Sequence, residues 1–178
     1  IRWPTLFDLS KANLDDVLKE WSGLGYYARA RNLHKSAEII SKEHLGKFPE
    51  HKKELILLPG IGDYTAAAIL SIAFNKRATA IDGNVERVIS RIFAIIEPLP
   101  SSKSYIREKA IEITPMKRYG DYAQAIMDLG STICLPRNPM CNECPWEEAC
   151  QARKAGIQQN LPVKKPKKTK PHRKGICF

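Results

Sequence analysis

Four cysteines near the end of the chain constrain its fold more than any other feature. Four of the five cysteines fall between Cys134 and Cys150, with six, two and five residues between successive thiols. The sequence shows no secretory signal pattern, so a framework of disulfide bonds is not expected. Zinc and an iron–sulfur cluster both accept four thiolates. The spacing matches neither a zinc ribbon nor a ferredoxin run, and we favour a [4Fe–4S] cluster held by Cys134, Cys141, Cys144 and Cys150.

Charge is distributed unevenly along the 178 residues. The net charge is +10, but the last eighteen residues hold seven Lys or Arg and no acid, against 22 bases and 19 acids in the first 160. The tail alternates lysine with proline. We expect a flexible basic linker that either attracts a polyanion such as nucleic acid or only keeps the protein soluble. No run of 18 or more apolar residues occurs, so no membrane-spanning helix is expected.

Apolar residues recur at helical spacing through most of the chain. In NLDDVLKEW, Asn13 is a good N-cap and apolar residues follow at i, i+3, i+4 and i+7. Residues 23–42 read as a loop feeding a helix, with one apolar face at Leu33, Ala37 and Ile40. Further helices are expected over 49–58, 65–74, 84–95, 104–113 and 121–134, the third with a stripe of Val85, Val88, Ile89, Ile92, Phe93 and Ile96. No segment alternates convincingly as a strand would, so the fold class is all-α.

The stretch LLPGIGDYTAAAIL places a tight glycine turn between two helices. Gly60 and Gly62 permit backbone angles that bulky residues resist, and their N–H groups beside a helix start could bind a phosphate oxygen. A P-loop or a Rossmann turn would need a preceding strand, which is not expected here. An ordinary connection between helices remains the simpler alternative.

A carboxylate stands just before the most amphipathic helix, in AIDGNVERV. Asp82 there is a normal N-cap, which typically stabilises a helix by about 0.5–2 kcal/mol. Apolar residues precede it and a tight turn follows. We therefore also expect a half-buried anion close to the glycine turn, where it could stabilise a cation developing on a bound sugar.

Two adjacent tyrosines precede a basic stretch in GLGYYARARNLHK. Both cannot point inward from one helical turn, so at least one is expected at the surface. Exposed aromatic rings beside Arg29 and Arg31 suit base stacking and phosphate contact. The alternative is a core tyrosine next to a solvated basic face.

Taken together, these stretches resemble the helix-hairpin-helix base-excision glycosylases that carry an iron–sulfur loop. The resemblance rests on LPGIGDYTAAAIL, then IDGNVERV, then the four-cysteine loop, and covers nearly the whole chain from about Trp3. Within that superfamily, WSGLGYYARARNLHK and AIDGNVERVISRIFAI are similar to the adenine DNA glycosylases of the MutY type. Those enzymes hydrolyse the N-glycosidic bond of adenine mispaired with 8-oxoguanine or guanine in double-stranded DNA.

The resemblance implies a role for each matched residue. Asp82 matches the aspartate that stabilises or briefly captures the sugar cation. Tyr64 matches a tyrosine found after the hairpin in some members, and Asn84 matches an asparagine beside the site. In endonuclease III-like relatives, which act on oxidised pyrimidines and cleave the strand, a lysine takes the place of Tyr64. Because tyrosine cannot form a Schiff base, the resemblance favours an enzyme that only removes the base.

The DNA-binding residues follow in the same way. Gly60 and Gly62 match the hairpin that holds a DNA phosphate, and Tyr26 matches the tyrosine that wedges into the duplex beside 8-oxoguanine. Arg29 and Arg31 accompany it. The four cysteines match the cluster ligands of the family.

By the resemblance, residues 1–81 are part of a six-helix module, 82–153 a cluster lobe, and 154–178 a basic linker. We expect a piece of a longer enzyme, whose preceding segment carries a catalytic glutamate and whose following domain is Nudix-like. On its own the piece would release adenine poorly. We expect a monomer that binds no membrane and acts in a bacterial cytoplasm, near the nucleoid, or in a nucleus. A DNA-binding module without catalysis is the remaining alternative, and Cys177 is expected to be a free thiol.

Overall fold

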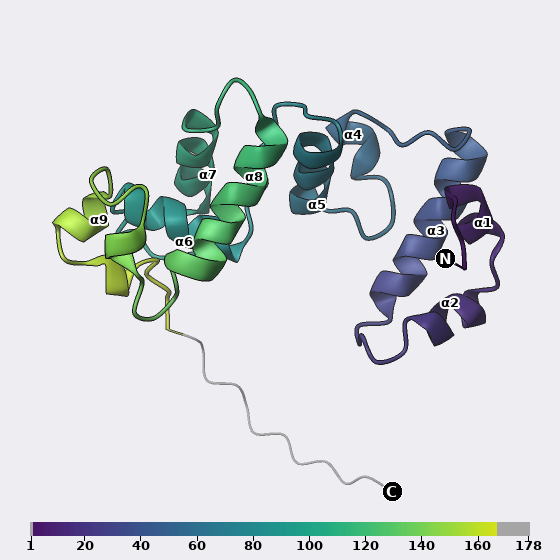
Figure 1. The fold of residues 1–178 in the computed structure, drawn as a ribbon, viewed down its shortest axis with the longest axis horizontal. Coiled ribbons are helices and arrows are strands. Elements are labelled where there is room, and N and C mark those ends of the chain that lie inside the picture. The colour runs from purple at the N-terminus through teal and green to yellow at the C-terminus, as the bar shows by residue number, and fades with distance from the viewer. Residues whose placement is uncertain (1, 167–178) are drawn as a thin grey trace, which may run out of the picture. The chain divides into compact units, whose positions relative to one another are not determined.

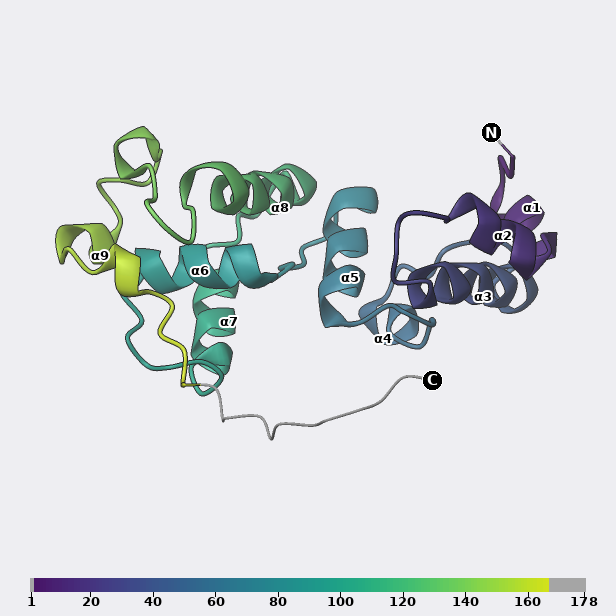
Figure 2. The same cartoon turned by 90° about the horizontal axis from the view of Figure 1, so that it is seen from below.

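The structure is a computed structural model that describes residues 2–166 (Figures 1 and 2). Within this part of the chain the regular structure is helical, apart from one isolated bridge between Leu99 and Lys164, which confirms the predicted all-α class. The helices are α1 (Leu6–Lys11), α2 (Leu14–Glu20), α3 (Ala28–Glu43), α4 (Lys52–Leu55), α5 (Asp63–Ala68), α6 (Gly83–Ile92), α7 (Lys103–Glu112), α8 (Tyr119–Asp128) and α9 (Gln151–Lys154). Two π-helical segments, η1 (Ile69–Ala73) and η2 (Leu129–Ile133), and two 3₁₀ turns, η3 (Cys141–Glu143) and η4 (Gln158–Asn160), complete them. None of these described helices has the length and apolarity needed to cross a membrane.

The chain divides into two compact units, which are described separately. Of the described residues, 2–82 and 113–126 make up the first unit, and 83–112 and 127–166 make up the second. The sequence prediction placed a single boundary between residues 81 and 82. The structure assigns residues 113–126 to the first unit, whereas the sequence prediction placed them in the second lobe. The functional assignment of the lobes stays a prediction.

The first unit is organised around α3. Short helices α1 and α2 pack along it, as both ribbon views show (Figures 1 and 2). The start of α1 is fixed by a capping box, in which the Thr5 hydroxyl accepts from the Asp8 N–H and the Asp8 carboxylate accepts from the Thr5 N–H. The core of this unit brings α3 together with the segments on both sides of the glycine turn and consists of Ile40, Leu55, Leu58, Ala66 and Leu70.

Some predicted faces differ from the structure. Ala37 and Ile40 are buried on α3, as expected, but Leu33 is 47% exposed. On α6 the stripe is buried at Val85, Val88 and Ile89, whereas Ile96 lies beyond the helix and is 69% exposed. Periodicity predicted both helices correctly. It also predicted that every apolar residue on each face would be buried, whereas Leu33 and Ile96 are exposed among the described residues.

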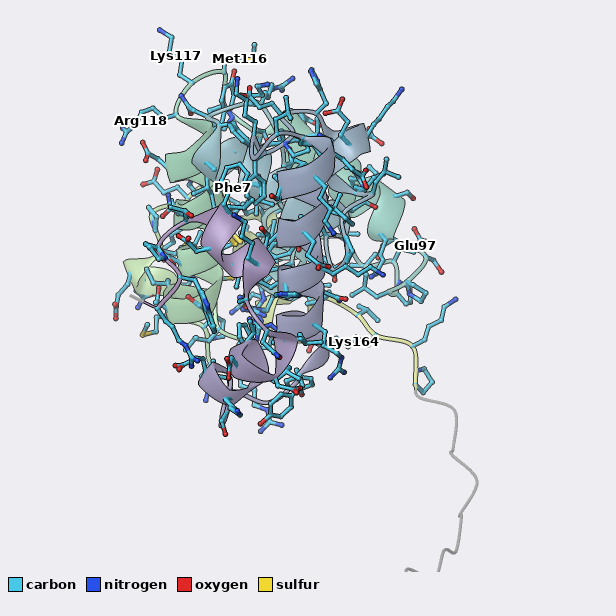
Figure 3. All side chains as sticks on the ribbon, turned by 90° about the vertical axis from the view of Figure 1, so that its right-hand side faces the viewer. Phe7, Glu97, Met116, Lys117, Arg118 and Lys164 are labelled. Atoms are coloured by element: carbon cyan, nitrogen blue, oxygen red, sulfur yellow. The ribbon has the colours of Figure 1, made fainter. Side chains whose placement is uncertain are left out.

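Two turns of the first unit illustrate its packing (Figure 3). The ring of Phe7, on α1, lies so close to the turn after α3 that a Cβ atom at Gly46 would overlap it. Met116, Lys117 and Arg118 project from the turn that precedes α8. Arg118 donates to the Asp121 carboxylate at 2.7 Å across the first turn of α8.

The second unit is organised around α6, against which α7, α9 and η2 pack. Two arginines one helical turn apart on α6 are buried with its apolar residues. Arg87 donates to the carbonyl oxygens of Gly130 and Cys134, at 2.5 and 2.8 Å. These carbonyls belong to the end of η2, where helical carbonyls lack partners of their own. Arg87 therefore joins α6 to the segment that leads into the cysteine loop.

Arg91 extends this connection and is only 2% exposed. Its guanidinium donates to the carbonyl oxygens of Leu135, Pro136 and Leu161, at 2.7, 3.2 and 3.1 Å, and to the Cys134 Sγ at 3.3 Å. A buried charge is costly unless its donors are satisfied, and these contacts satisfy them. One side chain thus holds both the entry to the cysteine loop and the chain that leaves it.

The beginning of the basic tail is part of this packing. Leu161 is buried, and the Leu99 N–H donates to the Val163 carbonyl at 2.8 Å. Residues 161–165 are therefore held against the second unit, where we had expected a flexible linker. Residues 154–160, which were also predicted as linker, include the end of α9 and the turn η4. Residues 167–178, including Cys177, lie outside the described part of the chain.

The arginine network leads to the first prediction. Arg91→Met should lower the free energy of unfolding by about 2–3 kcal/mol, because it removes a donor from three carbonyl groups that are partly or fully buried. Arg107→Met, an exposed position on α7 of the same unit, is the matched control and should change it by less than about 0.5 kcal/mol. Denaturant unfolding followed by circular dichroism measures both. Equal effects of the two substitutions would contradict the role given to Arg91.

Candidate functional site

The glycine turn of the first unit joins α4 to α5 and is held by α3. Gly60 has φ +78, in the left-handed region that favours glycine. A Cβ atom there would also come within 2.9 Å of the Asn32 Cβ. The Ser36 hydroxyl, one turn further along α3, donates to the Pro59 carbonyl at 2.9 Å. The turn therefore keeps one conformation relative to α3.

The two predicted glycines of this turn play different parts. Gly62 is the N-cap residue of α5, with φ −94 and ψ −176, which is extended backbone open to any residue. Nothing lies within 4 Å of a Cβ atom built on it. The sequence suggested backbone angles at both glycines that bulky residues resist; such an angle occurs at Gly60 and not at Gly62. Both are exposed, so the turn presents its backbone to the surface.

The tyrosine pair lies in the turn between α2 and α3. Tyr26 is 83% exposed and Tyr27 41% exposed, which excludes the alternative that one of them belongs to the core of the described unit. Arg29 and Arg31 are exposed on the first turn of α3. The guanidinium of Arg29 lies over the ring of Trp21, 5.4 Å from its centroid. An exposed ring and two exposed cations therefore share one end of α3.

The three residues predicted to be catalytic lie in the first turn of α5, directly before α6 and in the first turn of α6. Tyr64 is in the first turn of α5 and is 41% exposed. Asp82 is half-buried and directly precedes α6, as the sequence led us to expect. The structure assigns Tyr64 and Asp82 to the first unit and Asn84 to the second. A half-buried carboxylate is poorly hydrated, so its charge acts more strongly on a nearby cation than it would in water.

Asn84 is fixed within the second unit by two contacts. Its side-chain oxygen accepts from Arg87 at 3.0 Å. On its other side it packs against Gly130, where an added Cβ atom would come within 2.7 Å of the Asn84 Cβ. Arg87 also binds the Cys134 carbonyl, so the first turn of α6 is connected through one side chain to the cysteine loop.

The four predicted cysteine ligands line a single pocket in the second unit. The pocket wall also includes Arg91, Arg153 and Gln158. Arg153 is paired with Glu147 at 3.0 Å, whereas the buried Arg91 donates to the Cys134 sulfur. The side-chain oxygen of Gln158 is buried without a hydrogen-bond partner in the described part of the chain.

The chemistry of this pocket suits a group bound by thiolates. Burial raises the pKa of the Cys141 and Cys144 thiols, which favours their protonated, uncharged form. A bound cation would reverse that preference by binding the thiolates. Among the described residues, no three or more Cys, His, Asp or Glu side chains are arranged to hold a metal ion. What the structure shows is a shared pocket, four thiols and a buried arginine that donates to one of them.

Sequence reasoning identified the cysteines, the turns and Asp82 but missed the residues that support them. Arg87 and Arg91 lie on the face of α6 opposite its apolar stripe, where periodicity predicts exposed side chains, so nothing in periodicity marks them as buried. Trp21, Asn32 and Ser36 were also missed, because their contacts come from segments distant in sequence. The spacing of four between Arg87 and Arg91, and between Asn32 and Ser36, was the available signal, since such residues share one helix face.

The chain is similar to known proteins over most of its length. Over 176 residues the chain is 43% identical to an adenine DNA glycosylase of Buchnera aphidicola subsp. Schizaphis graminum, an alignment that covers 94% of this chain and 49% of that protein. The chain thus spans about half the length of that relative. The structure is similar to that of a thermostable thymine-DNA glycosylase, with a TM-score of 0.77, 28% identity, and 86% of this chain and 72% of that chain covered.

A second solved structure, a non-covalent endonuclease III–DNA complex, matches with a TM-score of 0.72 and 26% identity, covering 88% of this chain and 73% of that one. The family model described as HhH-GPD superfamily base excision DNA repair protein matches residues 2–116, which include the glycine turn, the tyrosine turn and Asp82. The chain therefore belongs to the HhH-GPD superfamily of base excision DNA repair proteins.

Proposed function

We propose that this chain is part of a DNA glycosylase that removes adenine mispaired with 8-oxoguanine or guanine. The observation that carries the proposal is the 43% identity with an adenine DNA glycosylase along almost the whole chain. The exposed tyrosine turn, the exposed glycine turn and the half-buried Asp82 supply the surfaces that such a reaction needs.

Duplex DNA is the proposed partner, in the cytoplasm of a bacterium or the nucleus of a eukaryote. The backbone N–H groups of the turn at Gly60 and Gly62 bind a phosphate oxygen, and Arg29 and Arg31 neutralise neighbouring phosphates. Tyr26 stacks beside the base opposite the adenine, which a largely exposed ring can do without unfolding the turn. The adenine itself must leave the stack, because its sugar bond cannot be reached inside the duplex.

Asp82 is proposed to act on the sugar. As the N-glycosidic bond breaks, positive charge develops on the sugar ring, and a half-buried carboxylate stabilises that charge. Its position directly before α6 fixes it at the end of a rigid element. Asp82 is therefore assigned the stabilisation of the sugar charge, and protonation of the departing base is not assigned to it.

Tyr64 favours base removal without strand cleavage. A Schiff base requires an amine, and the phenol at this position cannot supply one. The solved endonuclease III neighbour makes strand-cleaving chemistry the natural alternative. Tyr64, in the first turn after the glycine turn, is the feature that argues against it.

The thiol pocket is proposed to hold a [4Fe–4S] cluster. Cys134, Cys141, Cys144 and Cys150 would bind it, and Arg91 would donate to the sulfur of the first ligand. When bound, the cluster supplies a rigid anchor for a loop that has little core of its own. Hydrogen bonds to the sulfurs, such as that of Arg91, are among the features that set the properties of such clusters.

The metal content tests this assignment. Protein purified without oxygen should absorb broadly in the visible and contain about four irons per chain, as the cluster formula requires. Cys144→Ser should lose most of that iron. Cys177→Ser is the matched control and should keep it, because position 177 does not fit the ligand spacing. Stoichiometric zinc without iron, in protein made with ample iron, would refute the cluster.

Adenine release tests the reaction. In the intact protein, Asp82→Asn should reduce release of adenine from an A:8-oxoguanine duplex by at least about a hundredfold, because it keeps the shape of the side chain and its capping ability but removes the negative charge. Binding to the same duplex should change little. Single-turnover assays and equilibrium binding measure the two effects, with Asp63→Asn on the exposed first turn of α5 as the control.

The product separates the alternatives. The wild-type product should be an unbroken strand that breaks only after alkali, and borohydride should trap no covalent complex. Nicking with efficient trapping would favour the endonuclease III-like activity. Lesion binding with no release of any base would favour a DNA-binding module.

A further inference from the structure

The turn that carries Tyr26 is held in an unfavourable backbone conformation. The φ angle is +87 at Gly23, +66 at Gly25 and +47 at Tyr26. Glycine adopts such angles readily, but in tyrosine they bring the Cβ atom too close to the backbone. The Tyr26 side chain is 83% exposed, so its own burial does not offset this cost. Neighbouring groups must therefore keep Tyr26 in place.

Trp21 contacts the turn on both sides of Tyr26. Its indole N–H donates to the Gly25 carbonyl, directly before Tyr26, at 3.0 Å. Its ring lies under the guanidinium of Arg29, three residues after Tyr26. The Arg29 N–H in turn donates to the Tyr26 carbonyl at 2.8 Å. The peptide groups on both sides of Tyr26 are thus tied, directly or through Arg29, to one indole.

Trp21 is itself well anchored. It is the residue that ends α2, and its backbone N–H donates to the Val17 carbonyl at 3.0 Å. Val17 is buried, and α2 packs on α3. The backbone of Trp21 is therefore fixed by α2, and its indole can restrain the more exposed turn that carries Tyr26.

We propose that Trp21 is a positioning residue for lesion recognition, which holds Tyr26 in the orientation needed to stack beside the base opposite the adenine. The inference rests on the proposed function, which gives Tyr26 its role. Trp21 touches no reacting atom. It acts by keeping the Tyr26 ring ready before DNA arrives, so that binding does not have to order the turn.

The surroundings of Trp21 extend this role to the glycine turn. Trp21 and Arg29 line a groove whose other residues include Phe48, Pro59 and Ile61. The glycine turn is fixed to the same helix that carries Arg29, through the contacts of Asn32 and Ser36. The glycine turn, which is proposed to bind a phosphate, and the Tyr26 ring, which is proposed to stack on a base, are therefore both positioned by α3 within the first unit. Tyr26 can be correctly placed relative to a bound phosphate only while Trp21 holds its turn.

Trp21→Phe is the informative substitution. It keeps an aromatic ring beneath Arg29 but removes the N–H that donates to Gly25. Trp3→Phe is the matched control, because Trp3 is also half-buried in the first unit and also lies beside a guanidinium, that of Arg2 at 5.0 Å. Tyr26→Ala and the double variant Trp21→Phe/Tyr26→Ala complete the set.

The first measurement needs no DNA. Two amides report on the turn in the intact protein: the Leu24 N–H donates to the Trp21 carbonyl at 3.1 Å, and the Arg29 N–H donates to the Tyr26 carbonyl at 2.8 Å. Their hydrogen exchange should become about two- to tenfold faster in Trp21→Phe, which corresponds to the loss of one neutral hydrogen bond. Trp3→Phe should leave both amides unchanged, and exchange in α3 beyond its first turn should be the same in both variants. Unchanged exchange of both amides in Trp21→Phe would overturn the inference whatever the protein binds.

The second measurement compares binding to an A:8-oxoguanine duplex with binding to the same duplex undamaged, at one salt concentration. Trp21→Phe should reduce the preference for the lesion by about two- to tenfold and leave binding to undamaged DNA within about twofold. In the Tyr26→Ala background, the same substitution should have no further effect, because Trp21 acts only through Tyr26.

The outcomes separate the two proposals. Additive losses in the double variant, or equal losses on both duplexes, would make Trp21 a general scaffold residue and overturn the inference. A wild-type protein that shows no preference for the lesion would overturn the proposed function, and with it the recognition role of Trp21, while the exchange measurement would still report whether Trp21 holds the turn.

Discussion

The second unit depends on two buried arginines of α6. Arg87 and Arg91 donate to carbonyl oxygens on the segment that enters the cysteine loop, and Arg91 also binds the chain that leaves it. A loop of this length has too few apolar residues to fold around its own core. The guanidinium groups supply directional contacts that hydrophobic packing cannot give, and their burial makes those contacts costly to break. A movement of the cysteine loop would therefore strain or break the hydrogen bonds that join it to α6.

The first turn of α6 connects the cysteine loop to the residues proposed to take part in the reaction. Arg87 binds Asn84 as well as the carbonyl of Cys134, and Asp82 directly precedes the helix. A group held by the four thiols would fix the loop, the loop would fix the arginines, and the arginines would fix the helix that follows Asp82. On this account the proposed cluster need not take part in the reaction. Its contribution would be to keep rigid the helix that directly follows the carboxylate of Asp82.

The sequence allowed much of this arrangement to be predicted, and the failures have physical reasons. Helical periodicity located α3 and α6, and the Asn13 cap marked the start of α2, because both signals are local. The first helix, α1, was missed although Thr5 and Asp8 form a capping box, since its six residues are too short for a periodic pattern. The π-helical segments were also missed, because periodicity does not separate them from the ends of α5 and α8. Tyr26 and Asp82 were singled out by residue type and motif, and their roles stay predictions. Trp21 and Arg91 were not, since their importance comes from partners that only the folded chain brings near.

We expect a metal group bound in the thiol pocket to keep α6 rigid. Amide hydrogen exchange, measured on the intact protein before and after removal of the bound metal by a chelator, tests this expectation. The amides of residues 83–92 should exchange faster after removal, together with those of residues 134–150, while the amides of α3 in the first unit keep their rates. If residues 83–92 keep full protection after removal of the metal, the connection through Arg87 and Arg91 does not carry the rigidity of α6.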